Sequence, residues 1–122
     1  MEHVRGIGGF FFTARDPEAV SRWYAQHLGV HAPPATYDAT DWHQEAGPTV
    51  FAPFGAEHAD SPHLGSGGWG INFRVRDLDA MVAQLEAAGI AVTVDAETYP
   101  NGRFASLYDP EGNAVQLWQP TP

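Results

Sequence analysis

Histidines close to carboxylates are the residues of this chain whose types and spacing could bind a metal. The chain has six histidines, and His58, Asp60 and His63 stand together in one glycine- and proline-rich stretch. His43 and Glu45 stand two residues apart, a spacing that places both side chains on one face of a strand. The His58-x-Asp60-x-x-His63 pattern matches no zinc motif supported by a helix or a hairpin. Solvated loop histidines are the simpler interpretation, and a metal site built from them is kept as an alternative.

Other catalytic arrangements are not visible in the sequence. The chain has no cysteine, which excludes disulfides, thiolate zinc sites and cysteine nucleophiles. It shows no catalytic triad and no pair of carboxylates at a recognised spacing. The glycines of residues 65–68 have no following helix that would make a phosphate-binding loop. The sequence therefore assigns no reaction and leaves open whether the protein is an enzyme.

Composition indicates a folded, acidic protein. Hydrophobic residues make up 43% of the chain and charged residues 17%, as in an ordinary globular domain. The formal net charge of −9 would repel phosphate backbones, which argues against a nucleic-acid partner. No apolar run reaches the roughly 18 residues of a membrane span, and the first five residues do not begin a signal peptide. We expect a soluble cytoplasmic protein with no membrane or nucleic-acid partner.

The elements that must position these residues follow a pattern that occurs twice, half a chain length apart. Each copy runs from an extended apolar segment through an aspartate into an amphipathic helix that stops at a glycine. The matched residues are Gly9, Phe12, Arg15, Asp16 and Ala19 in the first copy and Gly70, Phe73, Arg76, Asp77 and Ala80 in the second. We interpret the pattern as a duplicated module. Module one covers about 6–54, a connection about 55–68 and module two about 69–119, all within a single domain, 1–122.

Local signals define the boundaries of both helices. Asp16 and Asp77 are expected N-caps, and Pro17 suits the first helical position because its missing N–H costs nothing there. Gly29 is expected to close the first helix in the left-handed conformation. Strands are expected over 6–14, as two or three short strands between Tyr37 and Phe54, and over 91–94, 104–108 and 114–119.

The doubled pattern and the ending Asp109-Pro110-Glu111-Gly112-Asn113-Ala114-Val115-Gln116-Leu117-Trp118 resemble the vicinal oxygen chelate superfamily. This superfamily holds glyoxalase I, bleomycin-resistance proteins, extradiol dioxygenases and fosfomycin-resistance enzymes. The resemblance covers about residues 6–119. It implies an α+β fold in which two tandem βαβββ modules form a paired half-barrel whose concave sheet lines a cavity. It also implies a homodimer, because open sheet edges need covering and related proteins often pair or exchange modules.

In that superfamily, a divalent metal is held by His, Gln or Glu on the first and last strands of each module. The resemblance places these four positions at Gly9, Gly70, Gln116 and, to within about a residue, Ala52. Glycine and alanine offer no ligand atom, and one neutral amide cannot hold a divalent cation. We therefore expect no metal and no other cofactor.

The residues beside these positions favour a pocket for an organic molecule. If Gly9 and Gly70 face the cavity, they leave room for a ligand there, and the strand period of two directs neighbouring side chains inward as well. By the same rule Trp118 shares a face with Gln116, whereas Phe104 and Ser106 are placed inward by the resemblance alone. Such a mixture of aromatic and polar groups is usual in small-molecule pockets. The predicted ligand-binding residues are Phe11, Trp42, Trp69, Asn72, Arg74, Phe104, Ser106, Gln116 and Trp118.

Three functions are weighed on this basis. The first is a metal-independent protein of the resistance or sequestration kind that binds a small, partly aromatic organic molecule. The second is a metal-dependent lyase, isomerase or dioxygenase that uses Gln116 or the loop histidines. The third is a structural or partner-binding module whose aromatic residues fill a core. Arg74 would receive a ligand carboxylate or phenolate, or pair internally with Glu45 or Asp95.

Overall fold

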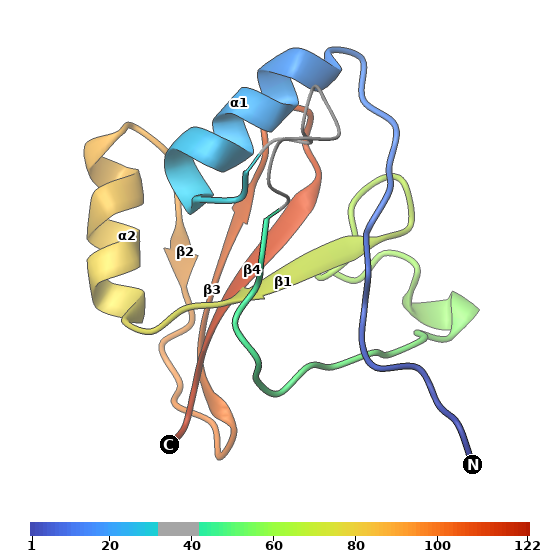
Figure 1. Ribbon diagram of the computed structural model, residues 1–122. Helices are drawn as coiled ribbons and strands as arrows, with labels where there is room; N and C mark the ends of the chain where they lie inside the picture. Colours follow the sequence, from blue (N-terminus) through green and yellow to red (C-terminus); the bar gives the residue numbers. More distant parts are fainter. Residues whose placement is uncertain (32–41) are drawn as a thin grey trace.

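The computed structural model of the chain describes residues 1–31 and 42–122 (Figure 1). The strands expected from Tyr37 onward therefore lie partly, over 37–41, outside the described residues. The elements in chain order are α1 (Pro17–Leu28), the 3-10 helix η1 (Ala56–His58), β1 (Gly70–Arg74), α2 (Leu78–Ala87), β2 (Thr93–Val94), β3 (Gly102–Tyr108) and β4 (Ala114–Pro120). No helix in this part of the chain has the length and hydrophobicity needed to cross a membrane.

One four-stranded sheet, in the order β1-β4-β3-β2, organises the molecule. β1 runs parallel to β4, and the other two pairs are antiparallel. With α2 between β1 and β2, this is the βαβββ arrangement expected for module two, and it is confirmed. The sheet is open rather than closed into a barrel.

The two helices supply the apolar layer on one face of the sheet. Val20 and Tyr24 of α1 and Leu78, Val82 and Leu85 of α2 form a buried cluster with alternate residues of β3 and β4. Because side chains alternate along a strand, the remaining positions of β1, β3 and β4 point to the opposite face. The helices thus leave one side of the sheet free to carry polar and aromatic groups.

The predicted helix boundaries are confirmed. The side chain of Asp16 accepts a hydrogen bond from the Ala19 N–H (3.2 Å), and Asp77 accepts one from the Ala80 N–H (3.0 Å). Gly29 adopts the left-handed conformation with φ 72°, which closes α1. The repeated Asp-to-Gly pattern therefore marks two equivalent helices.

Module one departs from the expected pattern, because it contributes α1 but no strand over residues 6–14 or 42–54. The strands predicted there are wrong for this structure. Phe10 and Phe12 pack against Trp69, with ring centroids 5.0 and 4.9 Å apart, instead of entering a sheet. The three glycines of residues 6–9, and the glycine and two prolines of residues 42–54, weaken a strand that has no neighbour to pair with.

Candidate functional site

The side of the sheet turned away from the helices, here called the open face, carries six of the nine predicted ligand-binding residues. They form two rows across the strands. One row holds Asn72, Gln116 and Ser106, and the next holds Arg74, Trp118 and Phe104. The parallel pairing of β1 with β4 brings residues from the start and the end of module two into these rows.

The first row is a set of hydrogen-bonding groups. The Asn72 side chain donates to Gln116 Oε1 (2.7 Å), and Gln116 Nε2 lies 3.4 Å from His63 Nδ1. Because an amide nitrogen only donates, His63 Nδ1 is the acceptor in this contact. The connection thus brings His63 to the edge of the open face, where the ring of Phe54 packs against it at 6.2 Å.

The second row is a rigid aromatic wall. The rings of Phe104 and Trp118 are stacked, with centroids 6.1 Å apart and planes 5° apart, and Tyr99 meets Phe104 edge-on at 5.8 Å. Trp118 Nε1 donates to the Asn101 carbonyl (2.8 Å), which fixes the indole. The Tyr99 hydroxyl donates to Asp95 (2.9 Å), and this bond to a carboxylate raises the pKa of Tyr99.

Arg74 binds module one through neutral acceptors. Its Nη1 donates to the Pro48 carbonyl (2.7 Å) and the Thr49 hydroxyl (3.0 Å), and its Nη2 donates to the Glu45 carbonyl (2.6 Å). A Cβ at Gly47 would lie 2.7 Å from Arg74 Nε, so this close approach suits glycine. The guanidinium therefore holds the backbone of residues 45–49 on the sheet, and its partner there is not the carboxylate of Glu45 or Asp95.

Three predicted residues lie away from the open face. Phe11 is 94% exposed, with its ring over its own neighbour Gly9. Trp42 packs near Phe73 (6.4 Å), a residue of the helix-covered layer. Trp69 lies just before β1, against Phe10 and Phe12. The structure therefore places these three predicted ligand-binding residues apart from the six on the open face.

The expected free space at the two glycines is not present. A Cβ at Gly70 would overlap the carbonyl oxygen of His63, because the connection crosses the sheet there. At Gly9, a Cβ would lie 3.1 Å from the Phe11 ring. The expectation that these glycines leave room for a ligand is wrong, because backbone and an aromatic ring fill the space.

The described histidines and carboxylates are scattered rather than grouped. Over residues 1–31 and 42–122, no three His, Asp or Glu side chains are grouped closely enough to hold an ion. His58 instead lies 3.6 Å from Glu57, and both side chains are largely exposed. The side chains of Gly9 and Gly70 have no ligand atom, and Gln116 lies beside His63, with Nε2 and Nδ1 3.4 Å apart.

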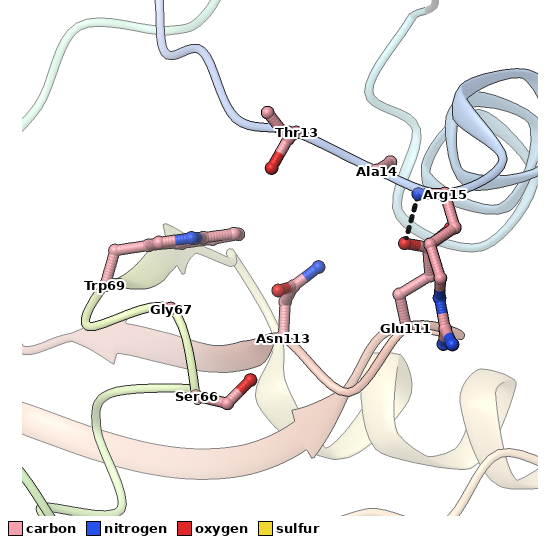
Figure 2. A pocket seen from close by; sticks show the side chains of 8 residues that line it. All are labelled: Thr13, Ala14, Arg15, Ser66, Gly67, Trp69, Glu111 and Asn113. Atoms are coloured by element: carbon pink, nitrogen blue, oxygen red, sulfur yellow. Dashed lines mark hydrogen bonds between the residues drawn. The ribbon is translucent and has the colours of Figure 1, made fainter.

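A hollow between the two modules was not predicted from the sequence; Figure 2 shows the residues that line it. It has a volume of about 350 Å³ and lies where the start of α1, the loop before β1 and the turn before β4 meet. Of its lining residues only Trp69 belongs to the predicted set. The lining residues are Thr13, Ala14, Arg15, Ser66, Gly67, Trp69, Glu111 and Asn113.

The turn of residues 109–113 ties α1 to module two beside this hollow. Glu111 accepts hydrogen bonds from the backbone N–H groups of Arg15 (2.7 Å) and Asp16 (2.9 Å). Buried Asp109 accepts one from the Tyr24 hydroxyl (2.8 Å). Burial, and then the bond to this carboxylate, raises the pKa of Tyr24 far above its ordinary value. The sequence was interpreted here as a turn, and the structure adds that the turn joins the modules.

Comparisons with known proteins agree with this architecture. A family model described as Glyoxalase/Bleomycin resistance protein/Dioxygenase superfamily matches residues 3–117. The solved structure of TnmS3, an antibiotic binding protein from Streptomyces sp. CB03234, aligns with 99% of this chain and 100% of its own, at a TM-score of 0.62 and 21% identity. A structure described as a glyoxalase family protein from Bacillus anthracis aligns over 85% of this chain and 84% of its own, at a TM-score of 0.52 and 17% identity.

A curated relative matches a shorter part of the chain. The glyoxylase-like protein CFP32 of Mycobacterium bovis is 40% identical over 55 residues, which are 44% of this chain and 21% of that protein. The match thus spans about a fifth of the length of this relative.

Proposed function

Because the chain belongs to the glyoxalase/bleomycin resistance protein/dioxygenase superfamily, we propose that it binds a small, partly aromatic organic molecule on the open face of its sheet. We also propose that this binding needs no metal. The resemblance drawn from the repeated modules and the final turn is confirmed at the level of the family. The ligand and its place on the sheet are what we propose.

The observation that carries this proposal is the pairing of the two rows on the open face. The half-buried Phe104 ring, stacked on buried Trp118, offers a flat apolar surface for another ring. The adjacent row supplies the Ser106 hydroxyl and the amides of Asn72 and Gln116 at fixed positions. A few placed polar groups beside an apolar wall are what orients a small ligand.

The fold neighbour TnmS3 supports the same proposal, since it is described as an antibiotic binding protein. Sequestration of a toxic compound needs only binding, which suits a site with no evident catalytic group. We propose that binding takes place in the cytoplasm, as expected from the sequence.

We also propose that the working form is a homodimer. Residues 6–14 and 42–54 form no strand, and they expose Phe11 and Phe51 to 94% and 90%. A second copy would cover these segments and the free edge of β1, which pairs only with β4 among the described strands.

A thermal-shift screen with aromatic natural products tests the binding proposal. A ligand that binds only the folded protein stabilises it by about 2.7 kcal/mol at a hundred times its Kd, which raises Tm by several degrees. Gln116→Leu should abolish the response, whereas Gln84→Leu, at an exposed position of α2, should retain it. No response across a broad library, or an unchanged response in Gln116→Leu, would overturn the proposal.

A metal-dependent lyase, isomerase or dioxygenase is a second candidate, favoured by one observation. His63 lies 3.4 Å from Gln116, so an imidazole stands beside the one retained family ligand position. Elemental analysis of protein purified without a histidine tag separates the two candidates. Stoichiometric iron, zinc, nickel or manganese would select the enzyme and reject metal-free binding.

A further inference from the structure

The hollow between the modules is separate from the open face. It is lined by residues 13–15 of module one, the loop over 66–69 and the turn over 111–113. Asn72 and Gln116 of the open face come three residues after Trp69 and Asn113, which line the hollow. A volume of about 350 Å³ lies at the lower end of the range of small-molecule pockets. The hollow therefore has room for one small ring.

Charge in the hollow favours a neutral ligand. Its lining has one acidic side chain, Glu111, and one basic side chain, Arg15. The N–H groups of Arg15 and Asp16 at the start of α1 already bind Glu111, so they are not available to an anion. The Glu111 carboxylate would repel an anion, and the Arg15 guanidinium would oppose a cation. Neither kind of ion gains a clear advantage here.

Hydrogen-bonding groups face the hollow from three segments. Figure 2 shows the side chains of Thr13 and Asn113 on opposite sides of it, with Ser66 near Asn113. The two hydroxyls both donate and accept. The Asn113 side-chain nitrogen donates to Asp109 (2.7 Å), which leaves its carbonyl oxygen to accept from a ligand. This combination suits a ligand whose hydroxyls also donate and accept.

Trp69 adds an aromatic wall at one side of the hollow (Figure 2). Phe10 and Phe12 pack against this indole at 5.0 and 4.9 Å, so its position is held by module one. A sugar ring has C–H groups on its faces and hydroxyls around its edge. We propose that the hollow binds a neutral polyhydroxylated ring, a sugar or a sugar-like group, with its hydroxyls on Thr13, Ser66 and Asn113 and its C–H groups against Trp69.

Saturation-transfer NMR on the full chain tests this proposal with four matched probes. They are methyl β-D-glucopyranoside, its 2-amino analogue as the cation, its uronate as the anion, and cyclohexylmethanol as a ring without the edge hydroxyls. We expect saturation transfer to the neutral glycoside when it is present at about 10 mM, a concentration at which weak binding is populated. The charged analogues and cyclohexylmethanol should give clearly weaker transfer.

Variants connect the signal to the hollow. Thr13→Val combined with Ser66→Ala removes two hydrogen-bonding groups at little change in shape, and should weaken glycoside binding about tenfold. Ser21→Ala, within α1, is the matched control and should bind as the wild type does. Trp69→Leu should also reduce transfer, with its Tm measured alongside to show that it is folded. No transfer to the glycoside, equal transfer to any of the other three probes, or unchanged binding by the double variant would overturn the proposal.

Discussion

At the scale of single residues, Asp109 explains why the final turn has its composition. It is 5% exposed and accepts from the Tyr24 hydroxyl, the backbone N–H groups of Glu111 and Asn113, and the Asn113 side chain. A buried carboxylate is tolerated when hydrogen bonds replace its lost water. Asp109 and Asn113 therefore act together, and the carboxylate also holds α1 through Tyr24.

Tyr24→Phe should destabilise the fold by about 1–3 kcal/mol at neutral pH, because it leaves a buried carboxylate short of a donor. The difference in unfolding free energy between Tyr24→Phe and the wild type should become smaller at alkaline pH. The pKa of Tyr24 is raised in the folded state from an ordinary value of 10.0, so its stabilisation is complete below pH 10.0 and falls as the pH rises above it. Urea unfolding of both proteins at pH 7 and above pH 10 measures this. Tyr108→Phe, at a 61% exposed residue, is the control. An equal pH dependence of wild type and Tyr24→Phe would contradict the prediction.

At the scale of elements, helices were predictable and the first strands were not. Asp16 and Gly29 determine the ends of α1 through local hydrogen bonds and one left-handed residue, so sequence alone is sufficient there. The strands of module two were also predictable because alternate residues pack against α1 and α2. For residues 6–14, three phenylalanines indicated a strand, but a strand needs a neighbour, and which segment supplies it is not a local property.

The same distinction holds for the candidate site. The period of two correctly grouped Asn72 with Arg74, and Gln116 with Trp118, on one side of the sheet. This strand period could not show what lies against Gly70, because the connection that crosses this glycine is an irregular segment. The hollow was missed for a similar reason, since its lining residues come from three segments far apart in the chain.

Gly70→Ala tests how firmly the connection lies on the sheet. A methyl group there would overlap the His63 carbonyl oxygen, so the loop must shift, at a cost of about 1–3 kcal/mol. Gly8→Ala is a matched control because nothing lies within 4 Å of its added Cβ, and it should change stability by less than about 0.5 kcal/mol. Chemical denaturation measures both. If Gly70→Ala were as stable as Gly8→Ala, the connection would not be held at this position.

At the scale of the whole molecule, apolar surface is distributed unevenly. The core lies between one face of the module-two sheet and the two helices, α1 of module one and α2 of module two. Module one leaves Phe11, Val50 and Phe51 exposed to 94%, 71% and 90%. Scattered exposed apolar residues are ordinary, but several large ones on segments outside the sheet are typical of a surface that another chain covers.

The homodimer is therefore the prediction with the widest consequence. Light scattering coupled to size-exclusion chromatography should give twice the 13.2 kDa chain mass at micromolar concentration. Phe11→Ser combined with Phe51→Ser should weaken association about 10- to 100-fold, since large aromatic residues dominate interface energies. Tyr108→Ser removes an exposed aromatic from β3, outside these segments, and should leave the mass unchanged. If the double variant stayed dimeric at all concentrations, the contact would lie elsewhere on the molecule. A monomeric wild type would contradict the homodimer, because the exposed phenylalanines of module one would then need no partner copy.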